Sequence, residues 1–254
     1  MELDEYSLIN QVEDKHWWYK GLHELTLHYL NSHVSSENPH PPIKILDAGC
    51  GTGGLLSHLD SKWKIYGIDI NPKAIEFAKK KTPGQFIQGN LHQIPFEDNF
   101  FDFIVSNDVI YHQEINEEQT VREIYRVLKP GGIFFGQVPA FKFLMSPHDK
   151  QVHTRKRYRK KEFEKLFPNS NFQIEKISYR IFILFPMVLI IRKIKTLMSN
   201  FKKNDKVSDI QMPSKFVNYL LLSILRTENF LLEYMSFPMG TSVFLVAKKL
   251  NFQR

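Results

Sequence analysis

The segment Ile45–Gly54 constrains the fold of this chain more than any other. It reads ILDAGCGTGG, an apolar run followed by a carboxylate and then by four glycines within six positions. Glycine lacks a Cβ, so such a turn reaches dihedral angles that other residues avoid, and its backbone can approach a ligand closely. If a helix follows the turn, the amides at its N-terminus face the same ligand. The sequence therefore predicts a ligand-binding loop at the carboxyl end of a buried strand.

Strand-like and helical patterns alternate on both sides of this loop. Apolar runs that read IKILDA, KIYGID, QFIQG, FDFIVS and GIFFGQV fall between residues 43 and 138, and they alternate with the helical patterns LLSHL, PKAIEFAKKK and EQTVREIYRVL. Two more strand-like runs, FQIEKISYRI and TSVFLVAKK, come later. Such alternation is typical of a parallel sheet with crossover helices. We therefore expect an α/β, Rossmann-like fold whose mostly parallel, seven-stranded sheet carries helices on both faces.

The remainder of the chain predicts two helical additions to this sheet. Residues 1–42 read as an N-terminal helical extension, because a helical pattern from residue 5 to about residue 36 is followed by three prolines. Residues 43–180 and 240–250 would form the Rossmann-like domain. Residues 181–239 contain two apolar helical segments before the last strand. They predict a helical insertion that acts as a lid over the substrate or against a membrane surface.

Composition and charge narrow the class of protein. The 254 residues are 43% hydrophobic and 24% charged and include one cysteine, Cys50, so the chain is typical of a globular protein and has no intramolecular disulfide. A single cysteine fits a reducing compartment. The first residues lack the basic start and apolar run of a signal peptide, so secretion is not expected. We expect a cytoplasmic protein without a metal site. The 34 basic residues exceed the 27 acidic ones by 7, which permits an anionic partner.

One segment predicts contact with a membrane surface. The longest uncharged apolar run, residues 181–191, contains Pro186 and is too short to span a bilayer, which takes about 20 residues. Arg192, Lys193 and Lys195 follow it directly, and apolar residues beside cations are typical of a helix that lies on anionic lipid. The segment is therefore expected either to pack as core or lid, or to make peripheral contact with the inner membrane surface.

Two cofactors compete for the glycine-rich loop. Gly49, Gly51 and Gly54 match the dinucleotide pattern GxGxxG, and Asp69 lies 20 residues after Gly49, where a ribose-binding acid is expected. However, Asp47 ends the first strand, where its carboxylate would repel the pyrophosphate of NAD and attract the cationic amino acid end of a sulfonium cofactor. The loop therefore favours S-adenosyl-L-methionine, and an NAD-dependent oxidoreductase is the alternative.

Four motifs in order resemble those of the class I S-adenosylmethionine-dependent methyltransferases. They are DAGCGTG at 47–53, GIDIN at 67–71, GNLHQIPFEDNFFD at 89–102 and LKPGG at 128–132. The resemblance implies that Asp47, Gly49 and Gly51 line the methionine part of the cofactor and that Asp69 binds the ribose hydroxyls. The full set of residues expected to contact the cofactor is Trp18, Asp47, Gly49, Cys50, Gly51, Asp69, Ile70, Asn90, Leu91 and Asn107. Ile70 would pack on the adenine, and Ser106 and Asn107 would border the transferred methyl group.

The N-terminal region resembles a narrower subgroup. Its residues match the signature ExxHWWxxG of bacterial methyltransferases that are often encoded beside surface-glycan or secondary-metabolite genes: Glu13, His16, Trp17, Trp18, Tyr19 and Gly21. Leu22 and His23 stand where that subgroup has two arginines. The aromatic residues of the signature are expected either to cap the cofactor or to pack as the buried face of a helix. Later matches extend the resemblance: Ser146, His148, Asp149, His153, Arg157, Tyr158, Pro238, Gly240, Thr241 and Ser242.

The segment after the fifth strand holds the candidate catalytic residues. His148, Asp149 and His153 fall in a loop expected above the carboxyl edge of the sheet, where a histidine beside a carboxylate can take a proton. A solvated polar loop is the alternative reading. The seven basic residues between Lys150 and Lys161, with no acidic one, predict either a solvated face or a clamp for an anionic substrate. His112 is as well explained by a structural role.

The function expected from these features is in-line methyl transfer, most simply to an oxygen of a small-molecule, glycan or lipid-linked glycan acceptor, which could be anionic. The alternatives are an RNA methyltransferase, an NAD-dependent oxidoreductase and a non-catalytic S-adenosylmethionine-binding protein. Methylation of nucleic acid bases is less favoured, because residues 106–109 read SNDV and lack the Pro-Pro-aromatic sequence that grips a planar amine.

Overall fold

The computed structural model describes residues 3–34, 42–146, 149, 152–199 and 212–251. Within them seven strands form one sheet in the order β3-β2-β1-β4-β5-β7-β6. Strand β7 pairs antiparallel with both of its neighbours, and the other pairs are parallel. The expected α/β, Rossmann-like fold is therefore confirmed. The strands are β1 (Ile43–Ala48), β2 (Trp63–Asp69), β3 (Gln85–Gln88), β4 (Phe101–Asn107), β5 (Leu128–Pro139), β6 (Phe172–Arg180) and β7 (Ser242–Lys249).

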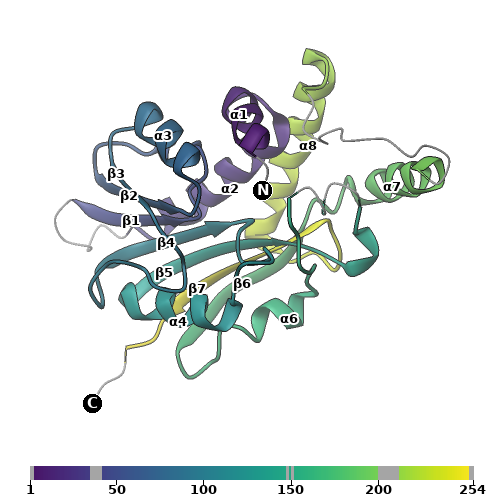
Figure 1. Cartoon of the computed structure of the whole chain (residues 1–254). Coiled ribbons are helices and arrows are strands. Elements are labelled where there is room, and N and C mark those ends of the chain that lie inside the picture. Colours follow the sequence, from purple (N-terminus) through teal and green to yellow (C-terminus); the bar gives the residue numbers. More distant parts are fainter. Residues whose placement is uncertain (1–2, 35–41, 147–148, 150–151, 200–211, 252–254) are drawn as a thin grey trace.

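Helices cover both faces of this sheet (Figure 1). Helices α1, α2, α3 and α8 lie on one side and α4 and α6 on the other, while α7 projects beyond the sheet. The helices are α1 (Leu3–Val12), α2 (Trp17–Ser32), α3 (Pro72–Lys81), α4 (Glu117–Val127), α6 (Lys160–Glu164), α7 (Phe185–Ser199) and α8 (Lys215–Tyr234), and η1 (Leu56–His58) and η2 (Lys142–Leu144) are short 3-10 turns.

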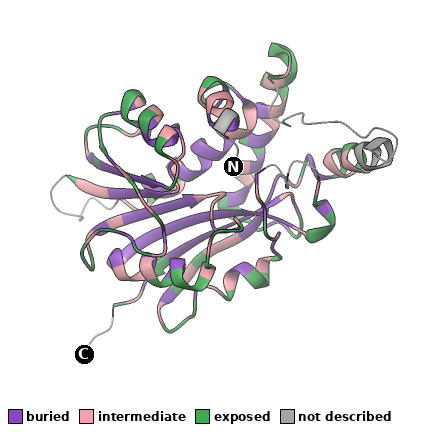
Figure 2. Ribbon diagram, viewed as in Figure 1, coloured by how far each residue is buried: buried purple, intermediate pink, exposed green. Residues whose placement is uncertain are grey.

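Local sequence explains why these segments form where they do. Helix α4 buries Thr120, Val121, Ile124 and Val127, which recur at helical spacing, and its N-cap Asn116 accepts a hydrogen bond from the amide of Gln119 at 3.1 Å. The central strands are apolar on both faces because helices cover both. Figure 2 shows this as a buried sheet between helices whose outer faces are exposed.

Two local predictions were wrong in detail. The helical pattern from residue 5 to about 36 forms two helices, because the chain leaves helix α1 after Val12 and His16 caps helix α2 in an extended conformation. The run LLSHL, which reads as a helix, forms only the turn η1. In both places the backbone follows contacts with the glycine-rich loop rather than its own helix propensity.

The N-terminal extension and the insertion pack on each other. Asn229 Nδ2 donates to the carbonyl of Gly21 at 2.8 Å, and Arg226 pairs with Glu24 at 2.6 Å. A Cβ on Gly21 would lie 2.7 Å from Leu225 Cδ1, so α2 and α8 approach closely at this glycine. The two additions therefore form one layer beside the sheet, although the domain boundaries expected from the sequence stay a prediction. In the part of the chain that the structure describes, no helix has the length and apolarity to cross a membrane.

Candidate active site

A cavity of about 530 Å³ lies at the carboxyl edge of the sheet. It is reached by the ends of β1, β2, β4 and β5 and by the start of β7, which is antiparallel and so begins at the same edge. All ten residues expected to contact the cofactor line it: Trp18, Asp47, Gly49, Cys50, Gly51, Asp69, Ile70, Asn90, Leu91 and Asn107. The topology thus brings these residues together, and their individual roles stay predictions.

The glycine-rich loop forms the floor of this cavity. Gly49 has φ +91° and Gly51 has φ +51°, conformations that favour glycine. The amides of Gly49 and Cys50 both donate to the carbonyl of Ile68, at 2.8 Å and 3.0 Å. A Cβ on Gly49 would lie 2.2 Å from Val109 Cγ2. The loop therefore fits directly against the segment that follows strand β4, and it leaves no room for a side chain at Gly49.

Asp69 links the end of β2 to this loop. Its carboxylate accepts hydrogen bonds from the amides of Gly51 and Asn71, both at 2.9 Å, and from the hydroxyl of Tyr6 at 3.5 Å. Burial raises the pKa of Asp69 and these hydrogen bonds oppose the rise. A carboxylate offers about four acceptor positions, so one remains for a ligand hydroxyl, and a second if Tyr6 turns away. Ile70 follows, lines the cavity and is 53% exposed, which suits contact with a flat apolar ring.

The cavity is also lined by several acidic side chains, and few positive charges of the described residues lie near them. Burial raises the pKa of Asp47 to about 8, and the neighbouring carboxylates of Asp69 and Glu13 add to the rise. A carboxyl group in this condition regains its negative charge when a cation enters beside it. The methionine end of S-adenosyl-L-methionine carries an ammonium and a sulfonium group. The acids present therefore fit this cofactor, whereas the pyrophosphate of a dinucleotide would add repulsion.

The N-terminal signature attaches the extension to the loop. Glu13 accepts a hydrogen bond from the hydroxyl of Thr52 and forms an ion pair with Lys81. A Cβ on Gly54 would lie 2.2 Å from Glu13 Oε2, so the carboxylate also lies over this glycine. His16 accepts a hydrogen bond from the amide of Trp18 at 3.3 Å, which starts helix α2. The extension thereby forms a wall of the cavity.

The two tryptophans of the signature lie between the cavity and an apolar cluster, and a role in capping the cofactor stays a prediction. Trp17 and Trp18 line the cavity. They also pack against a small apolar cluster that joins α2 to the insertion, formed by Ile181, Leu184, Leu221, Ile224 and Leu225. An apolar wall thus runs from the cavity to helix α8.

Removing Glu13 is expected to loosen this attachment. Glu13→Ala leaves Lys81, whose side chain is 14% exposed, without its nearest partner, so we expect the free energy of unfolding to fall by about 2 kcal/mol in urea denaturation. Asp14→Ala is the control, because Asp14 is 48% exposed and 3.5 Å from the same lysine, and it should change stability by less than about 0.5 kcal/mol. Equal effects of the two variants would contradict a special role for Glu13.

The other half of the cavity carries groups suited to an acceptor. They include Tyr19, Asp108, Tyr111, His112, His153, Arg157, Thr241 and Ser242. Burial lowers the pKa of His112 to about 4, and backbone carbonyls hold its ring, which favours the structural reading of this histidine. Thr241 and Ser242 reach the cavity because β7 starts beside the end of β5.

Asp149 is held by an arginine. Arg157 donates to the two carboxylate oxygens through Nε at 2.8 Å and Nη2 at 3.1 Å, and to the carbonyl of Ala140 at 3.1 Å. Burial alone would raise the pKa of Asp149, but Arg157 and Ser146 keep it below its ordinary value. Asp149 is thus an ionised partner of Arg157. His153 lines the cavity with φ +54°, and His148 lies outside the described residues.

The structure changes the interpretation of Arg192. The sequence places it among cations that would face a membrane, but its side chain lines the cavity, with Nη1 3.8 Å from Asp149 Oδ2. The side chains of Lys193 and Lys195 lie outside the described part of the structure.

Sequence reasoning assigned no role to Asp108 and Arg157, which line the cavity, or to Arg180. Asp108 directly follows Asn107, so its place after the fourth strand was the signal that could have found it. Arg157 appeared in the sequence only as a match to the subgroup pattern and as one of a run of basic residues, with no role assigned to it. Arg180 is fully buried beneath the site, and its Nη1 lies 3.4 Å from Gln137 Oε1. No local pattern marks a buried arginine.

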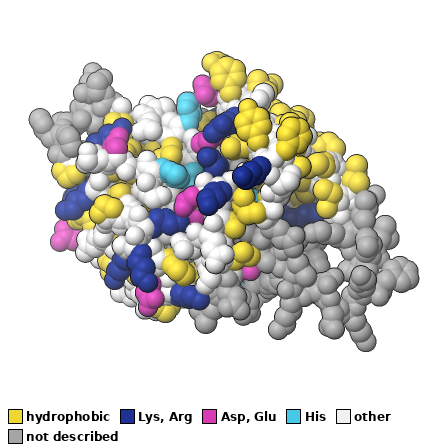
Figure 3. Space-filling model, turned by 90° about the horizontal axis from the view of Figure 1, so that it is seen from above, with side chains coloured by type: hydrophobic (Ala, Val, Ile, Leu, Met, Phe, Trp, Pro, Cys, Tyr) yellow, Lys and Arg dark blue, Asp and Glu magenta, His cyan; other side chains and the backbone are white. Residues whose placement is uncertain are grey.

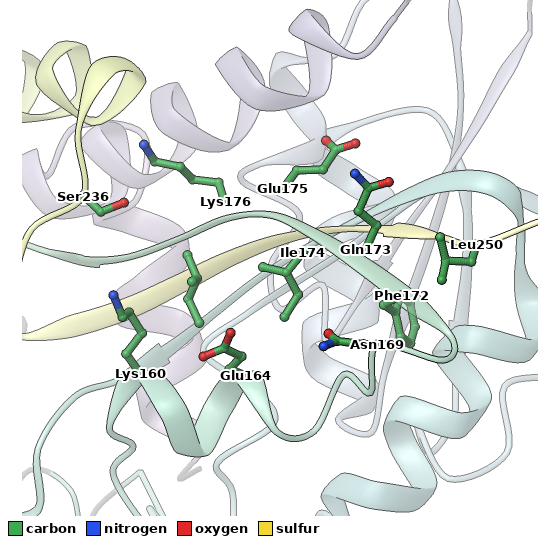
Figure 4. Close-up of a pocket in the computed structure, with 11 residues that line it drawn as sticks. Lys160, Glu164, Asn169, Phe172, Gln173, Ile174, Glu175, Lys176, Ser236 and Leu250 are labelled. Atoms are coloured by element: carbon green, nitrogen blue, oxygen red, sulfur yellow. The ribbon is translucent and has the colours of Figure 1, made fainter.

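A second hollow, of about 790 Å³, lies along the edge strand β6. Figure 4 shows Lys160 and Glu164 on one side of this strand and Gln173, Glu175 and Lys176 on the other. Lys160 of the basic run lines this hollow, but none of the residues expected to contact the cofactor does, so the cavity above the glycine-rich loop is the candidate site.

Comparison with known proteins shows similarity to methyltransferases. Residues 46–136 match a family model described as a methyltransferase domain. The chain is 31% identical over 137 residues to Uncharacterized methyltransferase YodH of Bacillus subtilis, covering 52% of this chain and 58% of that one. It is 40% identical over 105 residues to 24-methylenesterol C-methyltransferase 2 of Arabidopsis thaliana, covering 37% and 28%. The chain thus spans at most about three fifths of the length of these two curated relatives.

Solved structures share the fold over nearly the whole chain. A complex of the Haloferax volcanii Trm112 methyltransferase activator with a putative methyltransferase matches with TM-score 0.60 and 18% identity, covering 100% of this chain and 98% of that one. Geranyl diphosphate C-methyltransferase from Streptomyces coelicolor A3(2), solved with S-adenosyl-L-homocysteine, matches with TM-score 0.57 and 14% identity, covering 89% and 78%. At these identities the likeness concerns the fold alone.

Proposed function

We propose that this chain, which contains a class I S-adenosylmethionine-dependent methyltransferase domain, transfers a methyl group to an oxygen of its acceptor. The observation that carries the proposal is the set of acids around the glycine-rich loop. Asp47 is buried with a pKa raised to about 8 beside Asp69 and Glu13, a surrounding that favours a cationic ligand. This surrounding also weighs against a dinucleotide as the cofactor.

The residues of the cavity would hold the cofactor in one orientation. Asp69 would accept from the ribose, Ile70 would cover the adenine with Asn90 and Leu91 at its edge, and Asp47 would face the amino acid end. When bound, S-adenosyl-L-methionine supplies a methyl group already activated by its positive sulfur. The protein then has to exclude water and align the acceptor with the methyl carbon, an effect that can contribute about 7–11 kcal/mol. Trp18 and Tyr19 would close the cavity from the N-terminal side. The proposal therefore includes membership of the ExxHWWxxG subgroup, whose signature contains these two residues.

A small-molecule or lipid-linked glycan acceptor, neutral or anionic, fits the acceptor half best. Histidine, tyrosine and arginine side chains there suit a hydroxyl-bearing group, while the apolar wall of Trp17 and Trp18 leads toward helix α8. Among the similar proteins, one is a sterol-type C-methyltransferase and another a geranyl diphosphate C-methyltransferase by name, and both names specify acceptors with apolar chains. His153, with His148 and Asp149 nearby in sequence, is the proposed source of basicity in this loop.

Binding and turnover test the proposal directly. Isothermal titration calorimetry should detect binding of S-adenosyl-L-methionine and of S-adenosyl-L-homocysteine, but not of NAD. S-adenosyl-L-homocysteine should form when sugars, prenyl phosphates or quinols are added, and addition of RNA should not stimulate it. Binding without turnover on any acceptor would favour a non-catalytic protein, and binding of NAD alone would overturn the proposal.

The same proposal includes peripheral contact with the inner surface of a membrane by an otherwise cytoplasmic protein. Apolar side chains gather on one side of the face shown in Figure 3, close to Lys and Arg side chains. Helices α7 and α8 carry exposed apolar side chains, among them Ile190 at 60%, Phe216 at 75%, Tyr219 at 67% and Leu220 at 48%. Single exposed apolar residues are ordinary on a protein surface, but a group of them on neighbouring helices marks an interaction surface.

Vesicle sedimentation checks this contact. The protein should sediment with vesicles that contain phosphatidylglycerol and less with pure phosphatidylcholine. Phe216→Asp should reduce the bound fraction several-fold, because it places a charge in the apolar surface. Gln93→Asp, an exposed site beyond helices α7 and α8, adds the same charge and should have little effect. No sedimentation with either vesicle would remove membrane contact from the proposal.

A further inference from the structure

Asp108 lines the cavity in a strained backbone conformation. It directly follows strand β4 and has φ +56°, a conformation that is uncommon outside glycine. Its amide donates to the carbonyl of Gln137 at 2.9 Å, and its Oδ2 accepts from Gln137 Nε2 at 2.8 Å. Two contacts with one residue of β5 therefore hold the backbone and one carboxylate oxygen. Strain kept in place in this way is typical of functional sites.

The second carboxylate oxygen is available to a ligand. Among the described residues no hydrogen bond reaches Oδ1 of Asp108, yet the residue lines the cavity and Oδ1 is not among the sealed, unpartnered polar atoms. A carboxylate left with an open acceptor position beside a cavity matches a ligand that brings a donor. The donor would have to approach from the cavity, because Gln137 occupies the other oxygen.

The position of Asp108 relative to the loop is fixed by its neighbour. Val109 is the residue whose methyl groups fill the space where a Gly49 Cβ would be. Asp108 therefore lies directly above the loop that is proposed to hold the methionine end of the cofactor. On its other side the cavity continues to Tyr111, His153 and Arg157. Asp108 thus stands where the cofactor half and the acceptor half of the cavity meet.

The charges around Asp108 keep it basic and ionised near neutral pH. Burial raises the pKa of Asp108 to about 6, while the hydrogen bond from Gln137 and the charges of Arg180 and Arg157 limit the rise. Tyr19 and Tyr111 line the same cavity, and the charge of Asp108 contributes to the raised pKa of both tyrosines. A group that is ionised at pH 7 but titrates close to it is well suited to accept a proton.

We infer that Asp108 is a catalytic residue that accepts the proton of an acceptor hydroxyl during methyl transfer. This inference depends on the proposed function. The acceptor oxygen forms its bond to the methyl carbon, the electron pair of the broken carbon–sulfur bond stays on sulfur, and the hydroxyl proton passes to Oδ1 of Asp108. The proton leaves to water after product release. The acceptor class is accordingly a hydroxyl compound. In this inference Asp108 takes the role of base that the proposed function gave to His153, and His153 orients the acceptor.

A pair of cofactor analogues tests the position of Asp108 without knowledge of the acceptor. Sinefungin carries an ammonium group where S-adenosyl-L-methionine carries its methyl group, and S-adenosyl-L-homocysteine has neither. An ionised Asp108 that faces the methyl position should therefore favour sinefungin. By calorimetry at pH 7.5, Asp108→Asn should weaken sinefungin about tenfold, a loss of about 1.4 kcal/mol, and leave S-adenosyl-L-homocysteine within about twofold. Asp98→Asn, at an ion pair with Arg126 away from the cavity, should change neither.

The wild-type protein gives an independent measurement. Its preference for sinefungin over S-adenosyl-L-homocysteine should decline as the pH is lowered from 7.5 to 5, because Asp108 becomes protonated. Effects of Asp47 cancel in this ratio, since both ligands share the amino acid end. An unchanged ratio in Asp108→Asn or across this pH range overturns the inference, and so does an equal loss of both ligands. A wild-type protein that binds neither ligand overturns the proposed function itself.

Discussion

Gly49→Ala is expected to abolish cofactor binding and to destabilise the protein at the same time. The added Cβ would lie 2.2 Å from Val109 Cγ2 and 2.8 Å from Val109 Cγ1, and alanine is strained at φ +91°. Relief of the clash requires the loop to move, which breaks the bonds from Gly49 and Cys50 to Ile68. We expect the free energy of unfolding to fall by about 3 kcal/mol and affinity for S-adenosyl-L-homocysteine to fall at least about 100-fold.

Gly51→Ala is the matched control for the clash. Its φ of +51° lies in the left-handed region, but no heavy atom lies within 4 Å of the Cβ that would be added. Urea denaturation should therefore show a loss of only about 1 kcal/mol, the cost of the backbone conformation. If the two variants lost equal stability, the contact between Val109 and the loop would not be what requires glycine at position 49.

The parts of this site that the sequence predicted have local signals. Glycine spacing, the apolar strand before it and the acid 20 residues later are all readable along the chain, and they located Asp47, Gly49 and Asp69 at the cavity. The sheet was predictable for the same reason, because alternating apolar runs of strand length occur at regular intervals. Buried strands have to be apolar on both faces, so their pattern survives in the sequence.

The parts of the site that the sequence did not predict depend on contacts between residues that are far apart along the chain. The break after helix α1 places Glu13 on Thr52 and Lys81, which are 39 and 68 positions away. Arg192 reads as a surface cation but lies 3.8 Å from Asp149, beside the cavity. Nothing in the residues around either position indicates such partners. Asp108 was missed for a related reason, since its importance comes from Gln137 and Val109 fixing an unusual backbone conformation.

Asp47→Asn is expected to have opposite effects on stability and on cofactor binding. In the protein without cofactor, burial raises the pKa of Asp47 to about 8, against about 3.9 in an unfolded chain. The unfolded state therefore loses its proton between these two values while the folded state keeps it. Stability of the wild type consequently declines with rising pH through this window, by at most about 1.4 kcal/mol per pH unit from this group. The amide that replaces the carboxyl group does not titrate, so the variant should be more stable than wild type in urea at pH 8 and similar at pH 4.

Cofactor binding should respond in the other direction, because the ligand is cationic next to Asp47. Binding favours the ionised carboxylate, so the affinity of wild type for S-adenosyl-L-methionine should rise between pH 6 and pH 8, and binding near pH 7 should release a proton. Calorimetry in two buffers of different ionisation enthalpy measures that proton. Asp47→Asn should weaken binding at least about tenfold at pH 8 and release no proton from this site, whereas the exposed Asp60→Asn should match wild type. If Asp47→Asn gained stability and kept its full affinity for S-adenosyl-L-methionine, the buried charge of Asp47 would serve neither the fold nor cofactor binding. The proposal that the acids around the loop bind the cationic end of the cofactor would then be wrong.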